Sequence, residues 1–142
     1  MILLDTTVLC YAVGVEHPVR EPCRRLLRAH AEGRIEATTT VEVIQEFAHV
    51  RARRRSRADA VVLARHYLSA LPLLVTRAED LDLGLTLFER HAALGAFDGV
   101  LAAVALNQQV EALASADRAF GAVPDLPWVD PASADIEQLI GR

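Results

Sequence analysis

Lysine, paired cysteines and long apolar runs are all missing from this chain of 142 residues. The two cysteines, Cys10 and Cys23, have no metal-ligand spacing, so we expect two reduced thiols in or near the core of a cytoplasmic protein. The longest apolar run, 99–106, is far shorter than the roughly 18 residues that a membrane span needs. Because Asp5 interrupts the first apolar stretch, we also expect no signal peptide and no membrane partner.

Several catalytic and binding motifs are absent as well. The chain contains no Cys-x-x-Cys, no closely spaced histidine pair, no Gly-x-Ser-x-Gly and no glycine-rich phosphate loop. These absences argue against a zinc site of the usual spacing, a serine hydrolase and a loop-type nucleotide-binding protein. The five histidines are scattered, and we expect them at the surface or at an interface rather than as ligands.

The distribution of charge is more informative than the net charge of −4. The negative total argues against a protein that holds nucleic acid by its overall charge. All 15 cations are arginines, and five of them fall in 51–57. This run either steers an RNA backbone or forms a solvated helix surface. The acidic group Glu79, Asp80 and Asp82 is expected at the surface, where the start of a helix favours negative charge.

Short apolar strand patterns alternate with helical patterns along the chain. We expect strands at 1–4, 35–39, 72–75, 112–115 and 128–129. We expect helices at 5–13, 19–32, 40–53, 58–70, 79–91, 98–108 and 136–140. Strands that alternate with helices favour parallel pairing through right-handed crossovers. The sequence therefore predicts one domain, 1–142, of the α/β class, a three-layer α/β/α sandwich with a central parallel sheet of four or five strands.

Four acidic residues stand where such a fold would bring them to one sheet edge. Asp5 ends the first strand, Asp117 follows the fourth, Asp98 opens the most apolar helix and Glu46 lies on the third helix. Ligands of open α/β sheets bind at the carboxyl ends of the strands. Carboxylates that converge there make an oxygen-only site for Mg²⁺ or Mn²⁺. The alternative for each aspartate is a helix cap or turn, and for Glu46 a solvated helix edge.

Two glutamates compete for the position on the third helix. At about 100° per residue, the apolar side chains form one buried stripe. The stripe consists of Val43, Ile44, Phe47, Ala48 and Val50. Glu46 flanks this stripe, whereas Glu42 lies further toward solvent, so we favour Glu46 as the site residue.

Four segments, in order along the chain, resemble the motifs of PIN-domain ribonucleases, in particular the VapC toxins of bacterial toxin–antitoxin pairs. They are Leu-Leu-Asp-Thr-Thr-Val-Leu at 3–9, Thr-Val-Glu-Val-Ile-Gln-Glu-Phe at 40–47, Phe-Asp-Gly-Val-Leu-Ala-Ala at 97–103 and Ser-Ala-Asp-Arg-Ala-Phe at 115–120. The resemblance runs from residue 1 to about residue 129. One departure is Gly99, where many relatives carry a bulkier residue, and it puts the local helix start in question.

The resemblance implies an acidic quartet around Mg²⁺ or Mn²⁺ with two supporting hydroxyls. The acids are Asp5, Glu46, Asp98 and Asp117, and the hydroxyls belong to Thr6 and Ser115. It also implies a parallel sheet with the first strand in the middle, a homodimer, and an antitoxin protein that binds it.

The function expected from this pattern is that of a metal-dependent endoribonuclease, the toxin of a type II toxin–antitoxin pair. It would hydrolyse RNA phosphodiester bonds by metal-activated water. An alternative is an inactive PIN-like module that binds RNA or a protein. A phosphatase would need a second aspartate where Thr7 stands, and a phospho-receiver would need a lysine, which the chain lacks.

Overall fold

The computed structural model describes residues 1–141, in which short strands alternate with helices. The strands are β1 (Ile2–Leu4), β2 (Ala37–Thr40), β3 (Leu73–Leu74), β4 (Ala112–Ala114) and β5 (Trp128–Val129). The helices are α1 (Thr6–Val13), α2 (Arg20–Ala31), α3 (Val41–Arg54), α4 (Arg57–Ala70), α5 (Ala78–Arg90), α6 (Ala96–Asn107) and α7 (Asp135–Ile140), with a 3₁₀ helix, η1 (Arg118–Ala122). Each predicted element is present with ends within two residues, and η1 is an addition.

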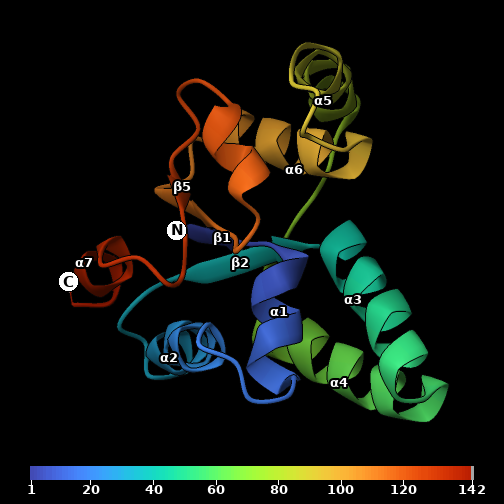
Figure 1. The fold of residues 1–142 in the computed structure, drawn as a ribbon, viewed down its shortest axis with the longest axis vertical. Helices are drawn as coiled ribbons and strands as arrows, with labels where there is room; N and C mark the ends of the chain where they lie inside the picture. Colours follow the sequence, from blue (N-terminus) through green and yellow to red (C-terminus); the bar gives the residue numbers. More distant parts are fainter. Residues whose placement is uncertain (142) are drawn as a thin grey trace.

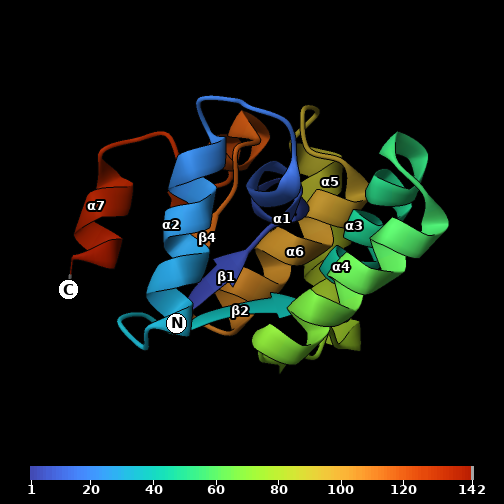
Figure 2. The same ribbon diagram turned by 90° about the horizontal axis from the view of Figure 1, so that it is seen from below.

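The five strands form one parallel sheet in the order β3-β2-β1-β4-β5. Leu3 of β1 pairs with Thr38 of β2 on one side and with Leu113 of β4 on the other. Helices α1, α2 and α4 cover one face, and α5 and α6 cover the other (Figure 1 and Figure 2). The predicted three-layer α/β/α sandwich is therefore confirmed, with β1 in the middle of the sheet.

The core lies on both faces of β1, because a central strand is covered by helices on each side. Leu3 and Leu4 are fully buried, and so is Leu113 on the neighbouring strand β4. Phe47 of α3 meets Tyr67 of α4 edge to face, with ring centroids 5.0 Å apart. Within residues 1–141, no helix combines the length and apolar character that crossing a membrane requires.

Helices α5 and α6 approach each other closely at two glycines. A Cβ on Gly84 would lie 2.6 Å from Cα of Val100, and a Cβ on Gly99 would lie 2.6 Å from the carbonyl oxygen of Gly84. Gly99 therefore has a packing partner on another helix, which explains a small residue there. Helix α6 begins at Ala96, two residues earlier than predicted, so Asp98 lies inside the first turn rather than at the start.

Asp80 corrects one expectation, because it is buried and not at the surface. Its Oδ2 accepts a hydrogen bond from the Arg77 N–H at 2.8 Å, at the start of α5. Its Oδ1 accepts one at 2.7 Å from Nδ2 of Asn107, the last residue of α6. Since both oxygens have donors, the carboxylate can be buried without the full cost of desolvation. Asp80 thus ties α5 to α6.

Candidate active site

A pocket of about 250 Å³ opens at the carboxyl edge of the sheet and contains all four predicted acids. Its walls come from the first residues after β1 and β4 and from helices α1, α3 and α6. The lining residues are Asp5, Thr6, Thr7, Cys10, Tyr11, Glu46, Val50, Arg54, Asp98 and Asp117. Ser115 lies behind this wall, fully buried and hydrogen-bonded to Asp5.

Asp5 is the most buried of the four acids, with 3% of its surface exposed. It also caps the start of α1, which is the alternative role that the sequence suggested for this residue. Its Oδ2 accepts hydrogen bonds from the Thr7 hydroxyl at 2.9 Å and the Ser115 hydroxyl at 2.6 Å. Burial raises the pKa of the Asp5 carboxyl, and these hydrogen bonds oppose the rise. The side chain is therefore fixed in place by two hydroxyls.

Thr7 and Ser115 link Asp5 to the segment that carries Asp117. Their hydroxyl oxygens are 3.3 Å apart. The Thr7 hydroxyl accepts a hydrogen bond from the Ala116 N–H, and the Ser115 hydroxyl accepts one from the Asp117 N–H, both at 3.0 Å. Thr7 was not predicted as a site residue. The signal for it was its place two residues after an aspartate, where a short polar turn commonly forms.

Glu46, on α3, faces the same pocket and is half-buried. Burial, and then the charge of Asp5, raise the pKa of its carboxyl, while the Thr6 hydroxyl and His49 lower it. The Thr6 hydroxyl is itself buried and has no partner at hydrogen-bonding geometry among residues 1–141. Thr6 therefore lines the same pocket and influences Glu46, whereas Thr7 and Ser115 bind Asp5.

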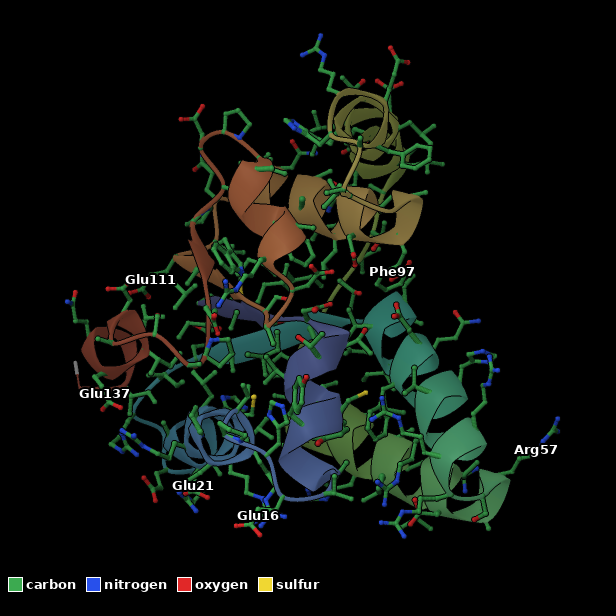
Figure 3. All side chains as sticks on the ribbon, viewed as in Figure 1. Glu16, Glu21, Arg57, Phe97, Glu111 and Glu137 are labelled. Carbon is green, nitrogen blue, oxygen red and sulfur yellow. The ribbon has the colours of Figure 1, made fainter. Side chains whose placement is uncertain are left out.

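Glu42 is separated from Glu46 by the fold. It was predicted to lie further toward solvent than Glu46, and both residues are half-buried. Its carboxylate accepts a hydrogen bond at 3.1 Å from the Thr76 hydroxyl. It lines a larger, mainly apolar cavity of about 500 Å³ between the starts of α3 and α6, where Phe97 also lies (Figure 3). That cavity is larger than the acidic pocket but contains none of the four predicted acids.

Asp98 and Asp117 complete the acidic wall. Burial, and then the charges of Asp5, Asp117 and Glu46, raise the pKa of Asp98 to about 7. The charges of the other three acids therefore act on the Asp98 carboxyl. Asp117 also caps η1, where its Oδ1 accepts a hydrogen bond from the Ala119 N–H at 2.9 Å.

The donor set of this pocket suits a hard divalent cation. Its polar atoms are mostly carboxylate and hydroxyl oxygens. A cation would relieve the like-charge repulsion that adds to burial in raising the pKa values of Asp98 and Glu46. No three His, Cys, Asp or Glu side chains of residues 1–141 are already arranged as a metal-binding group. A preformed cage is not required, since Mg²⁺ is commonly held by one or two carboxylates and several waters. The residues therefore fit such an ion by their chemistry.

Arg54 and Tyr11 are pocket residues that the sequence did not single out. Arg54 follows Glu46 and Val50 at intervals of four along α3, so the three share one side of the helix and line the pocket. That spacing was readable in the sequence. The Tyr11 ring packs against His17, with centroids 4.6 Å apart. Cys10 also lines the pocket, but burial raises the pKa of its thiol to about 11, so it stays protonated.

Comparison with known proteins identifies the family of this chain. The PIN domain family model matches residues 2–126. The chain is 50% identical to Ribonuclease VapC7 of Mycobacterium tuberculosis, and the match covers 99% of both chains.

Two solved structures share the fold at low sequence identity. The crystal structure of M. tuberculosis VapC20, a toxin described as cleaving the sarcin–ricin loop, is similar with a TM-score of 0.73 at 18% identity, over 86% of this chain and 94% of that one. VapBC2 of Rickettsia felis, crystallised with a DNA fragment from the promoter, also has a TM-score of 0.73, at 17% identity over 92% and 98% of the two chains. The predicted resemblance is confirmed: this chain belongs to the PIN-domain family, among its VapC-type members.

Proposed function

We propose that this protein is a metal-dependent endoribonuclease, the toxin of a type II toxin–antitoxin pair. The observation that supports this most strongly is the pocket in which Asp5, Glu46, Asp98 and Asp117 meet, although 112 positions separate the first from the last. The near-full-length similarity to a VapC ribonuclease supports the choice of RNA as the substrate.

The proposed roles follow from position and environment. Asp5 and Asp98 would hold Mg²⁺ or Mn²⁺ directly or through water, and Asp117 would contribute a further carboxylate to the same ion or to a second one. When bound, such an ion would supply a more acidic water and offset charge on the scissile phosphate. Glu46 orients the attacking water and accepts its proton, for which a raised carboxyl pKa is an advantage.

Thr7 and Ser115 keep Asp5 in place during this reaction. Both donate to Oδ2 of Asp5, which limits the rotation of its carboxylate. Water attacks phosphorus and the bond to the 3′ oxygen breaks, so the products carry 3′-hydroxyl and 5′-phosphate ends, as the family resemblance implies.

We propose an antitoxin and a second copy of this chain as the protein partners, acting in the cytoplasm. The family resemblance is the main support. In addition, α5 leaves Leu81, Leu85 and Phe88 about half exposed, which is apolar surface that a protein contact would cover.

The test is cleavage of a labelled RNA by the purified protein with Mg²⁺ or Mn²⁺ and with EDTA. We expect wild type to cut only with metal, and Asp5→Asn and Asp98→Asn to lose at least about 100-fold in rate, the order of a lost general base or metal ligand. Asp82→Asn is the matched control, because Asp82 is exposed on α5. Cutting in EDTA, or undiminished cutting by either site variant, contradicts the proposal. RNA binding without cleavage would favour a non-catalytic module.

A further inference from the structure

The five arginines of 51–57 have different environments in the folded chain. Arg51 has a structural role, since its side chain is 14% exposed and binds Asp59 and the carbonyl oxygen of Val13. Arg57, at the start of α4, points away from the body of the molecule (Figure 3). Only Arg54 of the run is among the residues that line the acidic pocket. The run is therefore not a uniform basic surface.

Arg54 reaches the acidic pocket without being neutralised by it. It is exposed, and within residues 1–141 no salt bridge joins it to a carboxylate. Its positive charge nevertheless lowers the pKa of the Cys10 thiol, which lines the same pocket. The guanidinium is therefore near the site and still has donors available for a ligand.

The charge balance of the pocket suggests that this guanidinium binds an anionic group of the substrate. Four acidic side chains and one cationic side chain line the pocket among the described residues. When all four acids are ionised, one divalent ion still leaves the pocket negative. A fixed positive charge beside the acids reduces the repulsion that an approaching RNA phosphate meets. Arginine suits that position, because its planar fork of donors binds phosphate oxygens in pairs.

We propose that Arg54 binds a backbone phosphate of the RNA and so positions the neighbouring scissile phosphate over the acids. This assignment rests on the proposed ribonuclease function and adds a substrate-binding residue to it. It separates one arginine of the run from Arg53 and Arg55, which are exposed but do not line the pocket.

The experiment compares the kinetics of RNA cleavage in Mn²⁺ for wild type, Arg54→Ala and Arg55→Ala. We expect Arg54→Ala to raise KM about tenfold, as for the loss of one charge-assisted contact worth about one power of ten. The logarithm of kcat/KM should also fall less steeply with the logarithm of salt, by roughly 0.7, because one phosphate contact to single-stranded RNA is lost. Arg55→Ala should change KM less than twofold and leave the salt slope as in wild type.

Two further measurements separate a binding role from a structural one. Arg54→Lys keeps the charge without the fork, so its salt slope should match wild type while its KM is intermediate. Mn²⁺ should raise the melting temperature of Arg54→Ala as much as that of wild type, because Arg54 is not a metal ligand. If Arg54→Ala folds poorly, Arg54→Gln, which keeps part of the side-chain stem, takes its place in the same assays.

The outcomes distinguish this proposal from the proposed function. If wild type does not cleave RNA, the ribonuclease proposal fails. If wild type cleaves, and Arg54→Ala or Arg54→Gln has the KM and salt slope of Arg55→Ala, only the role of Arg54 is overturned. A lowered melting temperature with an unchanged salt slope in both variants also overturns it, because Arg54 would then support the fold alone.

Discussion

Replacing Asp98 with asparagine should stabilise the metal-free protein at pH 8 while abolishing its proposed activity. The pKa of this carboxyl is about 7 in the folded chain, against 3.8 for a free side chain. Between these values the folded state binds the proton and the unfolded chain does not. The free energy of unfolding therefore falls as pH rises from about 4 through about 7, and what is lost is the stability present at low pH.

The size of the effect follows from the same values. The full difference in pKa of Asp98 corresponds to about 4 kcal/mol, and solvent screening of a partly exposed group reduces it to roughly half. Asparagine also loses the attraction of a carboxylate to the start of α6, about 0.5 kcal/mol. Roughly 1 to 2 kcal/mol of stabilisation remains at pH 8, which is about 3 to 6 °C in Tm for a chain of this size.

Thermal unfolding in EDTA at pH 5 and pH 8 measures this effect. Wild type should melt lower at pH 8, and Asp98→Asn should lose a large part of that difference. Burial also raises the pKa values of Asp5 and Glu46, so some pH dependence should persist in the variant. Asp82→Asn, the exposed control, should behave as wild type. A lower Tm for Asp98→Asn than for wild type at pH 8 without metal would refute the reasoning.

Two predictions concern the packing of α5 against α6. Gly84→Ala places a Cβ 2.6 Å from Cα of Val100 and should cost about 1–3 kcal/mol in urea unfolding. Gly95→Ala, where a Cβ meets nothing within 4 Å but the glycine N-cap of α6 is replaced, should cost less, about 0.5 kcal/mol. Equal losses in the two variants would contradict the close approach. Asn107→Leu leaves one oxygen of the buried Asp80 without its amide donor and should lower stability by about 1–3 kcal/mol. A neutral result there would show that another donor replaces the amide.

The sheet and three of the acids were predictable because their signals are local. A short apolar strand that ends in Asp5, and another followed by Asp117, place both residues at the carboxyl edge of any parallel sheet. Glu46 was separated from Glu42 by helical periodicity alone, and the structure puts the two in different cavities. Their proposed roles in catalysis remain predictions.

Other features depend on contacts between distant segments, which no local pattern reveals. From its place at a helix start, Asp80 was predicted to be a surface charge. Its burial depends on a second hydrogen-bond donor from Asn107, at the end of the next helix. The glycine at position 99 has no explanation in the local sequence. The structure explains it by the close approach of Gly84 on α5. Thr7 binds Asp5 locally, but its contacts with Ser115 and with the Ala116 N–H exist only because β4 lies beside β1.

Binding of Mn²⁺ to the purified protein, measured by isothermal titration calorimetry without RNA, tests the central claim most directly. The account predicts saturable binding to wild type and to Asp82→Asn, and no measurable binding to Asp5→Asn, since Asp5 is the buried acid that its neighbours hold in the pocket. Binding of equal affinity and stoichiometry to Asp5→Asn and to wild type would contradict a metal site formed by these four acids.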